Sequence, residues 1–80
     1  MRNEDLLERI TVDPKVMVGK PIIKGTRVTV YEIVNRIAQG QSYEAVEKDL
    51  EITRNDIKAA LTYAGHLADD EEIFPLIAGS

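Results

Sequence analysis

One stretch decides how the first part of the chain folds: Ile10-Thr-Val-Asp-Pro-Lys-Val-Met-Val-Gly-Lys-Pro-Ile-Ile-Lys-Gly-Thr-Arg-Val-Thr-Val30. Short runs of β-branched residues in it are separated by Asp13-Pro14, by Gly19-Lys20-Pro21 and by Lys24-Gly25-Thr26. This alternation is typical of short strands joined by tight turns. We therefore expect a strand at residues 9–13 and a hairpin in which residues 16–18 pair with residues 22–24.

Three helices are expected after this stretch, at residues 30–39, 43–50 and 54–67. Thr29 and Glu32 have the spacing of a capping box, in which a hydroxyl and a carboxylate satisfy free N–H groups at a helix start. Ser42 and Thr53 are suited to begin the next two helices in a similar way. Gly40 tolerates positive φ and is placed to end the first of the three. Residues 1–8 are expected to be a frayed end or a short helix.

These elements predict an α+β fold, mostly α, with a short N-terminal β element followed by a three-helix bundle. The link between the second and third helices is about Glu51-Ile52-Thr53, which is the spacing of a helix-turn-helix. Glycine is common in that turn and is missing here. We expect residues 1–68 to form the domain and residues 69–80 to form an acidic, then apolar, tail.

Size and composition narrow the class of protein. The 80 residues are enough for one domain, and the absence of cysteine together with a single histidine argues against disulfides and thiolate or histidine metal sites. A domain this small buries only about 60% of its unfolded surface, so we expect a homodimer. The charged first residues do not form a signal peptide, and no apolar run approaches the ~18 residues of a membrane span. We expect a cytoplasmic protein that is not an enzyme and has no cofactor or metal.

The charge of the chain is segregated into a basic hairpin region, residues 15–27, and an acidic tail. The net charge is −4, and the four acids at residues 69–72 account for all of it. Residues 15–27 contain four basic side chains and no acidic one. A net-acidic protein is a poor DNA binder by itself, but a partner that covers the tail removes this disadvantage.

A longer pattern links the chain to a known family: Ile-x-x-Asp-Pro-x-Val-x-x-Gly-Lys-Pro-x-Ile-x-Gly-Thr-Arg-Val-x-Val, then Ala38-x-Gly40 and Asp56-Ile-x-x-Ala-x-x-Tyr63. Over about residues 9–67 this pattern resembles the bacterial domain-of-unknown-function family 433. The resemblance implies a homeodomain-like helix-turn-helix with a short β element in front. It also implies an antitoxin that silences a PIN-like ribonuclease toxin and represses its own operon. Leu50 departs from the family, which often has proline before the third helix.

Two groups of residues are candidates for DNA contact. Outward residues near the start of the third expected helix would reach base edges or phosphates, and the basic hairpin would contact the phosphate backbone. The candidates are Lys20, Lys24, Arg27, Arg54, Asn55, Lys58 and Thr62. The alternative for the helix is an ordinary solvated face, on which Asp56 would repel phosphate. The alternative for Arg27 is a structural role, as a helix cap or as a partner of Glu32 or Asp13.

The apolar part of the tail is the candidate partner-binding segment. Its residues are Ile73, Phe74, Leu76 and Ile77. They can fold back on the domain or on a sister subunit, or become ordered on a partner. An acidic and apolar tail suits a nuclease toxin, because carboxylates can occupy a phosphate-binding cleft. A second hypothesis is a protein-interaction adaptor that never binds DNA, indicated by the acids spread over the expected helices.

Overall fold

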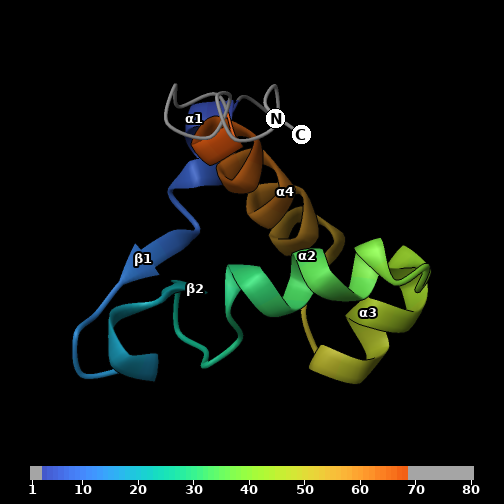
Figure 1. Ribbon diagram of the computed structural model, residues 1–80, viewed down its shortest axis with the longest axis horizontal. Coiled ribbons are helices and arrows are strands. Elements are labelled where there is room, and N and C mark those ends of the chain that lie inside the picture. Colours follow the sequence, from blue (N-terminus) through green and yellow to red (C-terminus); the bar gives the residue numbers. More distant parts are fainter. Residues whose placement is uncertain (1–2, 69–80) are drawn as a thin grey trace, which may run out of the picture.

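A computed structural model of the chain describes residues 3–68 (Figure 1). The elements in order are α1 (Asn3–Leu7), β1 (Ile10–Val12), the short 3-10 helix η1 (Met17–Gly19), β2 (Pro21–Ile23), α2 (Val30–Ala38), α3 (Tyr43–Leu50) and α4 (Arg54–Ala68). The fold is α+β and mostly α, with a two-stranded sheet ahead of the three longer helices, as the sequence predicts. Within residues 3–68, no helix has both the length and the apolar character needed to cross a membrane.

The two strands pair with a register that differs from the expected hairpin. β1 and β2 are antiparallel, with Ile10 opposite Ile23. The predicted strand at 9–13 is confirmed in its position, but the predicted pairing of residues 16–18 with 22–24 is wrong. The partner of β2 is β1, so residues 13–20 form the connection between the strands and contain no strand.

Backbone conformation explains this difference. Met17, Val18 and Gly19 have φ angles of 50°, 56° and 75°, a left-handed conformation that a β-ladder cannot use. The chain already turns at Asp13, whose Oδ1 accepts a hydrogen bond from the N–H of Lys15 at 2.9 Å. Asp13-Pro14 is therefore the turn signal that ends β1, and Gly19 ends the left-handed segment before β2.

The helices begin where the sequence predicts because their caps form. Thr29 Oγ1 accepts from the N–H of Glu32 at 3.0 Å, and Ser42 Oγ accepts from the N–H of Ala45 at 3.1 Å. Each hydroxyl satisfies one of the N–H groups that a helix start leaves free. Gly40, with φ of 96°, follows the end of α2. The predicted hydroxyl caps and the predicted stop are confirmed. The carboxylate half of the capping box expected at Thr29 and Glu32 is not seen in the described residues, because Glu32 Oε2 accepts from Arg36 instead.

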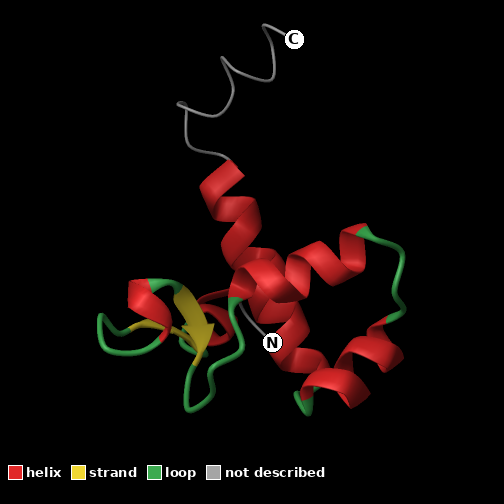
Figure 2. Ribbon diagram, turned by 60° about the horizontal axis from the view of Figure 1, so that its bottom comes forward, coloured by secondary structure: helices red, strands yellow, loops and turns green. Residues whose placement is uncertain are grey.

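The core lies where α2, α3 and α4 meet. Its largest fully buried side chains are Ile33 from α2, Val46 from α3 and Ile57 from α4, each 0% exposed. Burying a side chain of this size contributes about 1.5–3 kcal/mol. α4 also contacts α1 and β1, and Figure 2 shows the strands with their loops on one side of α4 and α3 on the other. The long helix is thus the element around which the rest packs.

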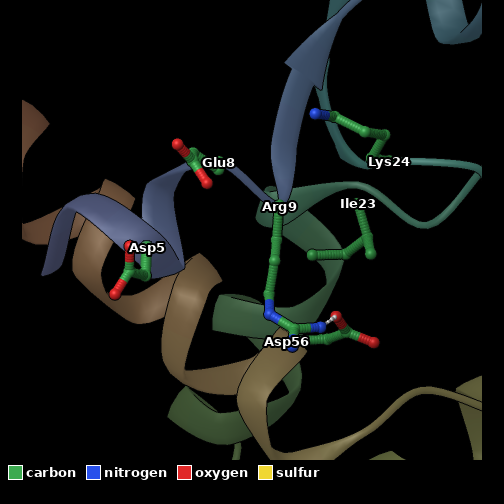
Figure 3. A pocket seen from close by; sticks show the side chains of 6 residues that line it. All are labelled: Asp5, Glu8, Arg9, Ile23, Lys24 and Asp56. Atoms are coloured by element: carbon green, nitrogen blue, oxygen red, sulfur yellow. Dashed lines mark hydrogen bonds and ion pairs between the residues drawn. The ribbon is translucent and has the colours of Figure 1, made fainter. Parts of the chain in front are cut away.

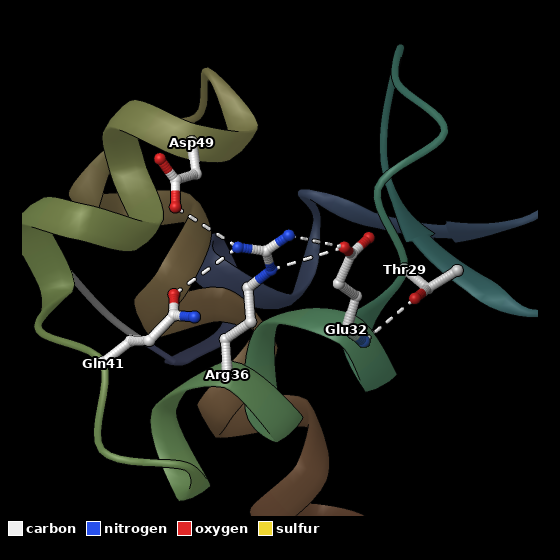
Figure 4. A network of polar contacts seen from close by, with 5 residues as sticks. All are labelled: Thr29, Glu32, Arg36, Gln41 and Asp49. Carbon is white, nitrogen blue, oxygen red and sulfur yellow. Dashed lines mark hydrogen bonds and ion pairs between the residues drawn. The ribbon is translucent and has the colours of Figure 1, made fainter.

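Arg36 joins α2 to α3 and to the loop between them (Figure 4). Its guanidinium donates to Glu32 Oε2 one helical turn earlier, at 3.2 Å. It also donates to Asp49 Oδ2 of α3 at 3.4 Å and to Gln41 Oε1 of the loop at 3.5 Å. One side chain therefore helps to set the angle between the two helices.

Candidate nucleic-acid interface

The connection between α3 and α4 is short and tightly bonded. Glu51 follows α3 in the left-handed conformation, with φ of 56° and ψ of 47°. The next N–H, of Ile52, donates to the carbonyl of Glu47 at 3.1 Å, which is the long bond of a Schellman motif. Ile52 itself is buried, at 8% exposed. The turn therefore fixes where α4 begins relative to α3.

The start of α4 is held by a reciprocal pair of hydrogen bonds. The N–H of Asp56 donates to Thr53 Oγ1 at 3.2 Å, and the N–H of Thr53 donates to Asp56 Oδ2 at 3.0 Å. The remaining oxygen of Asp56 accepts from Arg9 Nη1 at 3.0 Å. The side chain of Asp56 is only 13% exposed and is paired with a cation. It therefore does not repel an approaching phosphate as the alternative of a solvated face requires.

The Arg9–Asp56 pair lies in an open cleft of about 530 Å³ between α1, the end of β2 and the start of α4. Figure 3 shows Arg9 extending towards Asp56, with Asp5 and Glu8 to one side and Lys24 to the other. Three carboxylates and two cations line the cleft, so their formal charges leave one negative charge. This balance does not favour an anion such as phosphate.

The outer face of α4, which is the third helix expected from the sequence, carries four of the candidate DNA-contacting residues. Arg54 and Lys58 are exposed, and Asn55 and Thr62 are half-buried. At roughly 100° per residue, these four positions share one side of the helix. Ile57 and Ala60, both 0% exposed, turn towards the core. The sequence periodicity therefore assigned the outer and inner faces of α4 correctly.

Arg54 is held by two residues of the preceding helix, Glu47 and Tyr43. Its Nε donates to Glu47 Oε2 at 3.2 Å, and its Nη2 donates to Glu47 Oε1 at 3.4 Å. Its guanidinium also lies 5.1 Å from the ring centre of Tyr43, within the range of a cation–π contact. No spacing rule links positions 43, 47 and 54, because a turn separates the two helices.

Lys24 and Arg27 lie on one hydrogen-bonded turn after β2. Thr26 Oγ1 donates to the carbonyl of Ile23 at 2.8 Å and accepts from the N–H of Val28 at 3.0 Å. Both basic side chains are exposed, and they line an open cleft of about 730 Å³. The turn therefore presents two cations to the same cleft.

The structural alternative for Arg27 is not seen in the described part of the chain. Neither Glu32 nor Asp13 contacts it: Glu32 pairs with Arg36, and Asp13 accepts from the N–H of Lys15. Over residues 3–68, the side chain of Arg27 makes no hydrogen bond or ion pair.

Lys20 lies apart from the other candidates. It lines an apolar groove of about 280 Å³ together with residues of α2 and of the last turns of α4. The candidate DNA-contacting residues therefore occupy three places: the outer face of α4, the turn after β2, and this groove. The candidate partner-binding residues Ile73, Phe74, Leu76 and Ile77 lie outside the described residues.

The described part of the chain is thus a small α+β domain in which a two-stranded sheet precedes three helices, the last two joined by a capped three-residue turn. Residues 10–64 match the family described as "Protein of unknown function (DUF433)". Because this match covers more than half of the 80 residues, the chain belongs to that family.

Two known proteins are similar to parts of the chain. An uncharacterized protein of Archaeoglobus fulgidus is 71% identical over 24 residues, which are 30% of this chain and 67% of that protein. The crystal structure of Rv2018 from Mycobacterium tuberculosis matches 74% of this chain with 25% identity and a TM-score of 0.63. The chain spans 27% of the Rv2018 chain. Neither name states an activity.

Proposed function

We propose that this protein is an antitoxin-like regulator, in which α3 and α4 form a helix-turn-helix that binds operator DNA. The observation that carries the DNA part is the outer face of α4, where Arg54, Asn55, Lys58 and Thr62 share one side of a helix that a short capped turn positions. The toxin part rests on the resemblance to antitoxins and on the acidic, then apolar, residues 69–80. The proposal includes a homodimer and no catalytic step.

In this proposal α4 enters the major groove with its N-terminal half, as a recognition helix does. Asn55 and Lys58 contact base edges or phosphates, and the turn that carries Lys24 and Arg27 contacts the phosphate backbone. Arg54 contacts DNA only after its ion pair with Glu47 breaks and its guanidinium pairs with a phosphate or a guanine instead. The paired Asp56 faces away from this surface, towards Arg9.

Toxin binding would strengthen DNA binding by removing repulsion. The acids at residues 69–72 carry −4 per chain, and the remaining charges of the chain sum to zero. A partner that covers these acids with its own basic cleft leaves a neutral domain with a basic turn. Since long-range repulsion by phosphate then disappears, the complex would bind the operator more tightly than the antitoxin alone.

A second candidate function is a protein-interaction adaptor without DNA binding. The observation that favours it is the ion pair between Arg54 and Glu47, which neutralises the most suitable base-reading side chain. The exposed Glu44 and Glu51 also lie on α3 and on the turn before α4. In an adaptor, charge reversal at Lys58 would leave the function intact.

The test is co-purification from the protein's own cells, with the full chain beside a full-length Phe74→Asp, Ile77→Asp variant. Recovery of a small nuclease by the unchanged chain alone supports the toxin part. Recovery of no nuclease by either chain contradicts it. For the DNA part, the logarithm of affinity for the operator region should fall steeply with the logarithm of salt concentration. A flat dependence would leave the adaptor as the better account.

A further inference from the structure

An apolar groove on the back of α4 lacks an occupant in the described part of the chain. Tyr31 and Val34 of α2 form one wall, and Tyr63 and Leu67 of α4 form the other. Its lining is almost entirely apolar. Tyr31 is 72% exposed and Leu67 is 45% exposed, so two large side chains at this groove remain in contact with water. Covering them would be favourable by the hydrophobic effect.

We infer that this groove is the docking site of residues 73–77 of the same chain. The segment reads Ile73-Phe-Pro-Leu-Ile77 and is rich in large apolar side chains. Ile73 follows Leu67 by six residues, which span roughly 20 Å when extended. The groove begins at Leu67 itself, so the segment can reach it after one reversal of the chain.

Charge supports the same occupant. The acids at residues 69–72 connect Leu67 to the apolar segment. Lys20 lines the groove and is exposed, and among residues 3–68 it makes no ion pair. With the segment in the groove, the linking acids pass a cation that the domain itself leaves unpaired.

A tether explains why the same chain, and not a second copy, is the occupant. A segment linked by a few residues is present at an effective concentration on the order of millimolar. A second copy that is free in solution would have to exceed that concentration to compete. The inference does not rest on the proposed function, since the groove would take the segment whether or not DNA or a toxin binds.

The groove and the outer face of α4, which carries Arg54 and Lys58, lie on different sides of that helix. At roughly 100° per residue, the side that carries Tyr63, Ala64 and Leu67 is turned roughly opposite to the side that carries Arg54 and Lys58. Docking therefore leaves the outer face of α4 open. A partner that binds residues 73–77 must first displace them from the groove.

The natural absence of cysteine permits a clean cross-linking test in the full chain. One variant carries Ala64→Cys, in the groove, with Ala78→Cys, just beyond the apolar segment. The matched control carries Gly65→Cys with the same Ala78→Cys. Residues 64 and 65 are neighbours on α4, but Gly65 is exposed and has open space where a Cβ would be added.

We expect the intrachain disulfide to form about tenfold faster in the Ala64 variant than in the Gly65 variant, although Gly65 is the more accessible position. Adding Phe74→Ala should abolish the preference. Equal rates in the two variants would overturn the inference. A covalent dimer as the main product would overturn it too, because the occupant would then be a second copy.

The tyrosines give a second measurement without cysteines. Tyr31 and Tyr63 line the groove, whereas Tyr43 lies on α3 beside Arg54. By NMR, Phe74→Ala should shift the ring resonances of Tyr31 and Tyr63 and leave those of Tyr43 in place. Unchanged resonances of all three rings would contradict docking of the segment.

Discussion

Arg9 Nη1 lies 3.0 Å from Asp56 Oδ1, and this contact joins the start of β1 to the first turn of α4 across 47 positions of sequence. The other oxygen of Asp56 caps α4 through the N–H of Thr53. One carboxylate therefore closes a helix start and ties the β element to the long helix. The orientation of α4, and with it the candidate DNA surface, depends on this carboxylate.

Replacing Asp56 should destabilise the domain more than its position near the surface suggests. Asp56→Ala removes a capping bond and leaves Arg9 without its partner, and we expect the free energy of unfolding to fall by about 2 kcal/mol. Urea unfolding followed by circular dichroism measures this change. Asp49→Ala is the control, because the side chain of Asp49 is 55% exposed and its loss should cost less than about 0.5 kcal/mol.

A double-mutant cycle separates the two roles of Asp56. If the ion pair contributes, Arg9→Ala and Asp56→Ala should be less than additive, with a coupling on the order of 1 kcal/mol. Strict additivity would mean that the cap alone accounts for the loss and that Arg9 does not hold α4.

Two helix ends of this chain have the same motif but different residues, and this permits a second prediction. Gly40 after α2 and Glu51 after α3 both have positive φ, of 96° and 56°. Holding a non-glycine residue in the left-handed region costs roughly 1–2 kcal/mol, and a glycine at that position removes this cost. Glycine also loses more conformational freedom on folding, which offsets part of the gain. Glu51→Gly should therefore raise the free energy of unfolding by about 0.5–1 kcal/mol.

The control for this variant lies on the same helix. Lys48 is exposed and helical, so Lys48→Gly should lower the free energy of unfolding by about 0.5–1 kcal/mol. Loss of stability in both variants would show that Glu51 is not strained in solution. Gly40→Ala should destabilise as well, because alanine does not tolerate its φ.

The core gives a third prediction. Ile57 of α4 is 0% exposed and belongs to the cluster shared with α2 and α3. Ile57→Val should cost about 1 kcal/mol and Ile57→Ala about 3 kcal/mol, because the second change leaves a larger cavity. Val12→Ala, at a position that is 52% exposed, should change the free energy of unfolding much less. Equal losses at the two positions would contradict the packing described above.

Local sequence signals were sufficient to locate the helices. The starts at 30, 43 and 54 follow from Thr29, Ser42 and Thr53, because a side-chain cap acts within three residues of itself. The strand pairing was missed, because Gly19-Lys20-Pro21 has the composition of a hairpin turn and yet follows a left-handed segment. Pairing depends on which distant strand is available, and the residues between two strands do not determine it.

The candidate site was predictable in part for the same reason. Helical periodicity places Arg54 and Lys58 on one face of α4, and both are exposed. It cannot show that Glu47 and Tyr43 hold Arg54 or that Arg9 neutralises Asp56, because these contacts join different elements. It also cannot separate Lys20 from the other basic residues, since the groove forms only when β2, α2 and α4 meet.

The last prediction concerns the ion pair that holds Arg54. Glu47→Gln keeps the size of the side chain but removes its charge, so under the proposed function Arg54 becomes available to DNA and one source of repulsion disappears. We expect operator affinity to rise several-fold, with a steeper dependence on salt concentration.

Lys58→Ala should do the opposite and reduce the salt slope by about 1. Lys15→Ala removes the same charge at an exposed position outside the proposed surface and should leave the slope unchanged. Electrophoretic mobility shift or fluorescence anisotropy over a range of salt concentrations measures all three. Equal slopes for Lys58→Ala and Lys15→Ala would show that any binding is non-specific attraction, and α4 would then not be a recognition helix.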